Sequence, residues 1–317
     1  MTRPVLIVAG PTASGKSHLA LAIAEAMGGT IINADSMQIY RELAVLTARP
    51  EPAALARVPH RLYGVLPVSE ACSAGRWRTM ALAEIESAHG EGRLPVVTGG
   101  SGLYLQALVE GIATIPEVPA ALRARGRELY AELGPAAFRQ ALAGRDPASA
   151  GLSDRQRLVR AWEVLAATGR PLAAWQQETS PGPAGQLDFA AVLIDPPRAE
   201  LYAAIERRLD AMMAAGALDE VAGLVARGVD PALPALRAVG IAELARHLAG
   251  ELPLAAAVAL AKQASRRLAK RQLTWLRHHQ PARATLVVGH RLGTQLSESL
   301  QDRIFNFIRQ NLLTVAE

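Results

Sequence analysis

The sequence predicts an α/β protein with a parallel-sheet core and a helical insertion. Five short apolar runs have the length and composition of buried parallel strands. Segments of helical periodicity separate several of these runs, which is the order expected of a doubly wound sheet. Residues 112–187 show no convincing strand. We therefore expect 1–111 and 188–317 to form the core and 112–187 a helical insertion domain.

The N-terminal elements follow in a simple order. Residues 5–9 (VLIVA) form the first apolar run, and a Gly-rich loop comes directly after it. A helix is predicted from His18 to Met27, ended by Gly28-Gly29. Residues 30–34 then predict a second strand that ends at Asp35.

The same alternation continues later in the chain. A helix over 77–87 precedes a third strand at 94–98, which the turn Gly99-Gly100-Ser101-Gly102 closes. Two further apolar runs, at 189–194 and 284–288, predict the remaining strands. Helical patterns also cover 201–209 and 254–275.

Helical patterns punctuated by proline and glycine fill the insertion. Residues 153–169 have a capping residue, an apolar stripe and a Gly-Arg-Pro stop, so they predict a helix. Its apolar face would carry Leu158, Ala161, Trp162 and Leu165. Residues 176–187 (QQETSPGPAGQL) are polar and rich in proline and glycine, which is typical of a linker.

Composition excludes several classes of protein. The one cysteine, Cys72, rules out an intrachain disulfide framework and a cysteine zinc cluster. No apolar run is long enough for a membrane span, and no secretory leader pattern opens the chain. We expect a soluble cytoplasmic protein, and a monomer. The net charge of +5, from 34 Lys and Arg against 29 Asp and Glu, leaves room for a polyanionic partner.

Residues 10–17 (GPTASGKS) match the phosphate-binding pattern G-x-x-x-x-G-K-[ST]. Glycines let the backbone curl until several N–H groups face one anion beside a helix N-terminus. Lysine adds a full charge, and the serine hydroxyl can bind Mg²⁺. The expected phosphate-binding residues are Gly10, Pro11, Thr12, Ala13, Ser14, Gly15, Lys16 and Ser17, with Ser17 also as the metal ligand.

The loop alone does not show whether the bound phosphate belongs to a nucleotide or to another diphosphate compound. P-loop NTPases and kinases normally hold Mg²⁺ with a second acidic residue at a strand end. The strand at 94–98 ends in Thr-Gly-Gly without an acid, although Asp35 and Asp195 end other strands. A small-molecule kinase that uses ATP, with Asp35 as the base, therefore stays open as the alternative.

Asp35 and Ser101 each follow a predicted strand. Ligands of open α/β sheets bind at the carboxyl ends of the strands, so both side chains are expected in one crevice with the phosphate loop. A carboxylate there can act as a general base. The alternative is that Asp35 caps the segment that follows it.

Several motifs, in order, resemble the tRNA dimethylallyltransferase (tRNA isopentenyltransferase) family over nearly the whole chain. They are GPTASGKS at 10–17, ADSMQIYR at 34–41, LTARP at 46–50, PHRL at 59–62, VVTGGSGLYLQALVEG at 96–111, QRLVRAWEV at 156–164, the helix RAELYAAIERRLDAMMAAG at 198–216 and AKRQLTWLR at 269–277. The resemblance implies a P-loop NTPase-like core. The sequence departs from the family's usual pattern at Leu46, Arg49, Ile241 and Ala242.

The resemblance also implies an activity. The loop would hold dimethylallyl diphosphate with Mg²⁺, and the acceptor would be N6 of the adenosine 3′ to a tRNA anticodon. Asp35 would be the catalytic base, with Ser101 hydrogen-bonding near the reacting amine. Prenylation of free adenine nucleotides and a non-enzymatic RNA-binding role are further alternatives, which the helical insertion and the intact loop disfavour.

The tRNA would be contacted from two parts of the chain. The extruded adenine would meet Asp35, Ser36, Met37, Gln38 and Ser101, although Met37 could equally be a core residue. The anticodon arm would meet Arg123, Gln156, Arg157, Val159 and Arg160, for which a solvated helix face is the alternative. Lys262, Arg266 and Lys270 form a basic stripe suited to phosphate contacts, and Arg198 and Arg208 are candidates for reaching the diphosphate.

Overall fold

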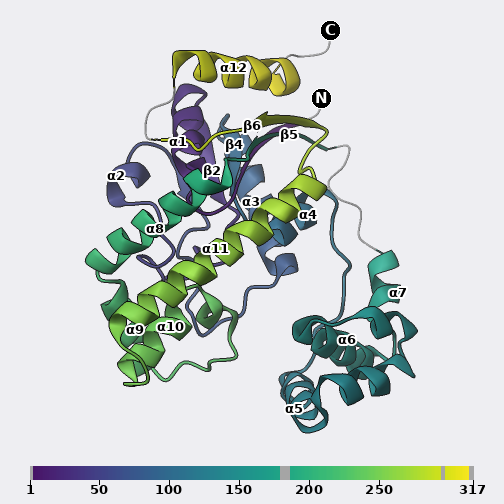
Figure 1. Ribbon diagram of the computed structural model, residues 1–317. Coiled ribbons are helices and arrows are strands. Elements are labelled where there is room, and N and C mark those ends of the chain that lie inside the picture. The colour runs from purple at the N-terminus through teal and green to yellow at the C-terminus, as the bar shows by residue number, and fades with distance from the viewer. Residues whose placement is uncertain (1–2, 179–185, 294–296, 314–317) are drawn as a thin grey trace. The chain divides into compact units, whose positions relative to one another are not determined.

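The computed structural model describes residues 3–178, 186–293 and 297–313, and it divides the chain into two compact units (Figure 1). The core unit comprises 1–110 and 183–317, and the inserted unit comprises 111–182. Among the described residues, no helix combines the length and apolar character needed to cross a bilayer.

A six-stranded, fully parallel sheet forms the centre of the core unit, in the order β3-β2-β4-β1-β5-β6. This confirms the predicted parallel α/β core. The strands are β1 (Arg3–Ala9), β2 (Gly29–Asn33), β3 (His60–Arg61), β4 (Leu94–Gly99), β5 (Leu187–Ile194) and β6 (Ala284–Val288). No sequence pattern predicts β3, because two residues cannot show a periodicity.

Helices cover both faces of this sheet. They are α1 (Lys16–Ala26), α2 (Pro52–Leu55), α3 (Ala74–Gly90), α4 (Gly102–Val109), α8 (Arg198–Ala214), α9 (Ala217–Ala226), α10 (Ile241–Leu248), α11 (Leu254–His278) and α12 (Glu298–Ile308), with short turns η2 (Pro234–Arg237) and η3 (Arg309–Leu313). On one face, α1 and α12 pack on the strands through residues such as Leu19 and Ile304 (Figure 1). Trp77 of α3 is fully buried, and its Nε1 donates to Asn33 O at 2.8 Å.

The inserted unit contains α5 (Ala120–Ala143), η1 (Pro147–Gly151), α6 (Arg155–Thr168) and α7 (Leu172–Gln177). Helix α5 is interrupted at Gly134, which has a non-helical φ of 74° and is followed by Pro135. Asp154 caps α6 by accepting from Arg157 N, so the cap lies one residue later than Ser153, the first residue of the predicted range. Phe138 and Leu142 of α5 pack against Leu158, Ala161 and Leu165 of α6. Of the predicted linker, residues 179–185 lie outside the described part of the chain.

Candidate active site

The phosphate loop connects β1 to α1 in a strained conformation. Gly15, with φ of 94°, is the residue before α1, and Ala13 has φ of 64° although it is not a glycine. Ser14 N donates to Pro11 O at 3.3 Å. The Ser14 hydroxyl is buried and has no hydrogen-bond partner in the described structure. These are the features of a loop shaped around a ligand.

Lys16 turns back into this loop. Its ammonium donates to Pro11 O at 3.3 Å, and the residue is 9 % exposed. Burial lowers the pKa of Lys16 to about 8, Asp35 opposes that shift, and Arg208 adds to it. Lys16, Asp35 and Arg208 therefore lie within electrostatic range of one another. An arriving anion would favour the charged ammonium.

Residues far along the chain hold the loop from outside. Arg291 Nε donates to Ala13 O at 3.0 Å, and Leu292 N donates to Ser14 O at 2.9 Å. A Cβ on Gly15 would lie 2.2 Å from Leu292 O, so only glycine fits. The sequence reasoning missed both residues, because nothing in the pattern around 291–292 marks a phosphate site.

Asp35 lies two residues after the end of β2, beside the turn after β4. Its Oδ1 accepts from Met37 N at 2.9 Å, which is the local capping geometry considered as the alternative. Ser36 links the two strand ends, because Ser101 Oγ accepts from Ser36 N at 3.0 Å and donates to Ser36 Oγ at 3.2 Å. A Cβ on Gly99 would lie 2.2 Å from Ala34 O, which explains the glycine there. The structure thus brings Asp35 and Ser101 to neighbouring strand ends.

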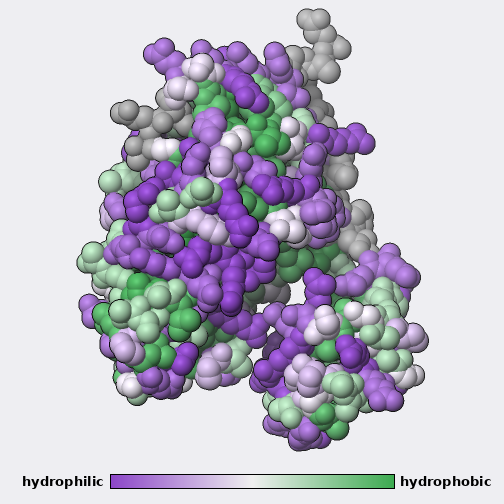
Figure 2. Space-filling view, in the orientation of Figure 1, coloured by the Kyte–Doolittle hydropathy of each residue, from purple (hydrophilic) through white to green (hydrophobic). Residues whose placement is uncertain are grey.

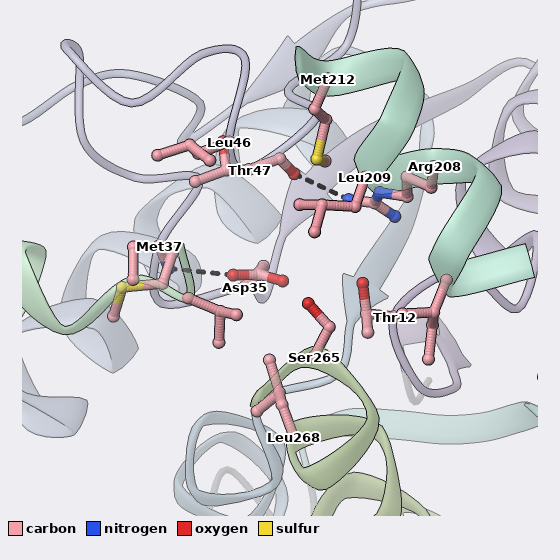
Figure 3. A pocket seen from close by; sticks show the side chains of 13 residues that line it. Thr12, Asp35, Met37, Leu46, Thr47, Arg208, Leu209, Met212, Ser265 and Leu268 are labelled. Carbon is pink, nitrogen blue, oxygen red and sulfur yellow. Dashed lines mark hydrogen bonds between the residues drawn. The ribbon is translucent and has the colours of Figure 1, made fainter. Parts of the chain in front are cut away.

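A small, solvent-open pocket contains Asp35 (Figure 3). Asp35, Thr12, Arg208 and Ser265 point toward its centre. Apolar side chains form much of the remaining wall: Met37, Leu46, Ile205, Leu209, Met212, Ala238, Val239 and Leu268. Arg208 Nη2 donates to Thr47 O at 3.0 Å, which fixes the direction of its guanidinium. The pocket therefore joins a charged region beside the phosphate loop to an apolar wall.

The predicted base-reading residues differ in their surroundings. Met37 lines the pocket. Gln38 Nε2 donates to Thr47 O at 2.8 Å and to Ala48 O at 3.1 Å, so its amide donors support the loop backbone. The sequence pattern does not indicate that Gln38 holds the backbone of this loop.

In the inserted unit, most of the predicted tRNA-contacting residues are accessible. Gln156 and Arg157 are exposed on α6, and Arg123 on α5 is half-buried. Arg160 pairs with Glu163 at 3.4 Å. Val159 is the exception, since it is 6 % exposed and its side chain packs in the apolar core of this unit rather than on the surface.

The basic stripe on α11 is partly neutralised by α8. Lys262 pairs with Asp210 at 2.7 Å and Arg266 pairs with Glu206 at 2.7 Å. Lys270 is exposed and lines a second pocket with Arg198. Arg198 is thus placed away from the Asp35 pocket that Arg208 lines. A dense hydrophilic band covers α8 and α11 in Figure 2.

Magnesium would find few protein ligands here. The described residues contain no group of three His, Cys, Asp or Glu side chains that could hold a metal. Asp195, one of the acids considered as a metal ligand, is bound to Arg277 through both carboxylate oxygens, at 2.9 and 2.7 Å. The Ser17 hydroxyl is exposed at the start of α1. Mg²⁺ usually binds through one or two protein groups together with substrate phosphates and water, and Ser17 is the residue predicted to hold it here.

Comparisons with known proteins agree with one another. The IPP transferase family model matches residues 38–279. The tRNA dimethylallyltransferase of Rhodospirillum centenum is 56 % identical over 280 residues, 87 % of this chain and 89 % of the relative. That of Rhodospirillum rubrum is 52 % identical over 316 residues, 99 % of this chain and 96 % of the relative.

Solved structures give a similar result. The tRNA isopentenylpyrophosphate transferase of Bacillus halodurans aligns with a TM-score of 0.69 at 28 % identity, covering 99 % of this chain and 97 % of that one. A eukaryotic dimethylallyltransferase acting on tRNA aligns with a TM-score of 0.77 at 23 % identity, covering 96 % of this chain and 80 % of that one. The second likeness concerns the fold alone.

Proposed function

The chain belongs to the IPP transferase family, and we propose that it transfers the dimethylallyl group of dimethylallyl diphosphate to N6 of the adenosine 3′ to a tRNA anticodon. The observation that carries the proposal is the pocket in which Asp35 and Arg208 lie beside Thr12 of the phosphate loop. The comparisons support a tRNA-modifying prenyltransferase and do not support the kinase alternative.

The diphosphate end of the donor would bind at the phosphate loop. The N-terminus of α1, which follows Gly15 of the phosphate loop, suits an anion, and Lys16 and Arg208 add positive charge. Ser17 would hold Mg²⁺, whose charge helps to stabilise the departing diphosphate when it is bound. The apolar wall around Leu209 and Met212 suits the dimethylallyl group.

Asp35 would act as the general base. The lone pair of an adenine amine is delocalised into the ring, so the amine becomes a competent nucleophile as it loses a proton. The N6–C1 bond forms, the bond between C1 and the diphosphate oxygen breaks, and one N6 proton passes to Asp35. Ser101, which is held through Ser36, would orient the amine.

The acceptor would be contacted by both units. The adenine must leave the base stack of the anticodon loop to reach a pocket, where Met37 offers an apolar surface. Arg123, Gln156, Arg157 and Arg160 of the inserted unit would contact the RNA backbone. Such contacts position the RNA and are sensitive to salt.

Nucleoside mass analysis tests the proposal. We expect an unmodified anticodon stem-loop, incubated with the protein, Mg²⁺ and dimethylallyl diphosphate, to gain one dimethylallyl group on the adenosine 3′ to the anticodon. A stem-loop with guanosine at that position is the matched control and should stay unchanged. Labelled phosphate passing from ATP to a small alcohol, with no prenylated nucleoside, would overturn the proposal in favour of a kinase.

A further inference from the structure

Glu220, in the first turn of α9, binds a loop of the core unit through three hydrogen bonds. Its Oε2 accepts from Ala44 N and from Val45 N, both at 2.8 Å. Its Oε1 accepts from Leu46 N at 3.0 Å. Three consecutive backbone donors on one carboxylate fix the orientation of the peptide groups that carry them.

The next residue of this loop holds the pocket arginine. The carbonyl oxygen of Thr47 accepts from Arg208 Nη2 at 3.0 Å and from Gln38 Nε2 at 2.8 Å. The Thr47 hydroxyl donates to Leu43 O at 2.6 Å, which closes the loop on itself. A shift of residues 44–46 would therefore move the acceptor to which Arg208 is bound.

Arg208 depends on this acceptor for its orientation. Burial lowers the pKa of Arg208, and the Asp35 carboxylate opposes that shift. In the described part of the chain, Thr47 O is the hydrogen-bond acceptor of the guanidinium. A half-buried guanidinium with this hydrogen-bond partner is oriented by it.

We propose that Glu220 is a positioning residue for the donor diphosphate, acting through the loop 44–47 on Arg208. The inference rests on the proposed function, because the anion that Arg208 would meet is the diphosphate. Glu220 itself does not line the pocket, so its effect on the anion is indirect.

Binding of inorganic pyrophosphate with Mg²⁺, measured by calorimetry, tests this separately from catalysis. We expect Glu220→Gln, which replaces one acceptor oxygen by an NH₂ group, to weaken pyrophosphate binding about tenfold, as for the loss of a charge-assisted hydrogen bond. The KM for dimethylallyl diphosphate should rise in parallel, with the KM for tRNA unchanged. Asp219→Asn is the matched control, because Asp219 is the exposed neighbouring acid on the same helix.

A double-mutant cycle identifies the route. If Glu220 acts through Arg208, Glu220→Gln should have no further effect on pyrophosphate binding in an Arg208→Met background. The inference would be overturned if the double variant lost pyrophosphate affinity by the product of the two single-variant factors. It would also be overturned if Glu220→Gln bound pyrophosphate as tightly as the wild type. If Glu220→Gln does not fold, Glu220→Asp provides the same comparison with a shorter carboxylate. A wild-type protein that transfers no dimethylallyl group refutes the proposed function instead, so the two failures are distinguishable.

Discussion

Gln272 Oε1 accepts a hydrogen bond from the backbone N–H of Thr12 at 2.8 Å, although 260 positions separate the two residues. The same side chain lies against the glycine turn after β4, since a Cβ on Gly100 would be 2.4 Å from Gln272 Nε2. Helix α11 therefore supports the phosphate loop and the turn that carries Ser101 at the same time. The geometry of the pocket depends on this shared support.

Asp35→Asn tests the general base. The amide can still accept from Met37 N, so the local turn is expected to persist. Loss of a general base typically lowers turnover by about 10²–10⁴-fold. We expect this fall in single-turnover transfer to the anticodon stem-loop, with little loss of affinity for the stem-loop. A turnover equal to that of the wild type would remove Asp35 from the proton transfer.

Lys16 predicts a pH dependence for anion binding. Its folded-state pKa of about 8 lies below the ordinary value of 10.5. Above pH 8 the Lys16 ammonium of the free protein loses its proton, so pyrophosphate affinity should fall. The fall should approach about tenfold per pH unit as long as Lys16 is protonated in the pyrophosphate complex. Calorimetry between pH 7 and 9.5 measures this, with Lys16→Met as the control that should be weak at every pH. A flat wild-type profile would contradict the assignment.

The same residue predicts how folding stability responds to pH. Because the folded-state pKa of Lys16 is lowered, the unfolded chain binds more protons between about pH 8 and 10.5. The contribution of Lys16 to the free energy of unfolding should therefore rise with pH across that window. Denaturant unfolding of the wild type and of Lys16→Met, compared at both ends of the window, isolates it. The free energy of unfolding of the wild type, minus that of Lys16→Met, should rise with pH across the window. A fall would contradict the assignment.

Gly15→Ala tests the contact with Leu292. The new Cβ would lie 2.2 Å from Leu292 O, at a backbone φ of 94°. We expect a loss of more than about 1–3 kcal/mol in the free energy of unfolding, the range for backbone strain alone, and weaker pyrophosphate binding. Gly92→Ala is the control, because it has φ of 67° with nothing within 4 Å. Equal melting temperatures for the two variants would show that the clash is relieved without cost.

Arg157→Gln tests the RNA surface of the inserted unit. Arg157 is exposed on α6, and removing one phosphate contact should weaken stem-loop binding and reduce the salt slope by about 1. Arg125→Gln is the comparison, since Arg125 is already paired with Glu132 at 2.9 Å. Titrations at several salt concentrations give both slopes. An unaltered slope for Arg157→Gln would place the RNA elsewhere.

Much of the fold could be predicted because its signals are local. Each of the five apolar runs is a strand of the parallel sheet. Helix boundaries differ slightly from the predicted ones where a capping residue sets them. Helix α6, for example, is capped by Asp154 rather than by Ser153. The two-residue strand β3 could not be predicted, because its pairing with β2 is the only thing that defines it.

The sequence by itself determined the phosphate loop, the acid at the end of β2 and the family resemblance, since each depends on residues adjacent in the chain. Only the tertiary structure decided which distant groups serve that loop. Gln272, Leu292 and Arg208 reach it through packing of separate helices and strands. It likewise decided that Lys262 and Arg266 are paired with acids of α8. A hydrogen bond or ion pair between remote residues depends on how the elements pack, and a single sequence does not record that packing.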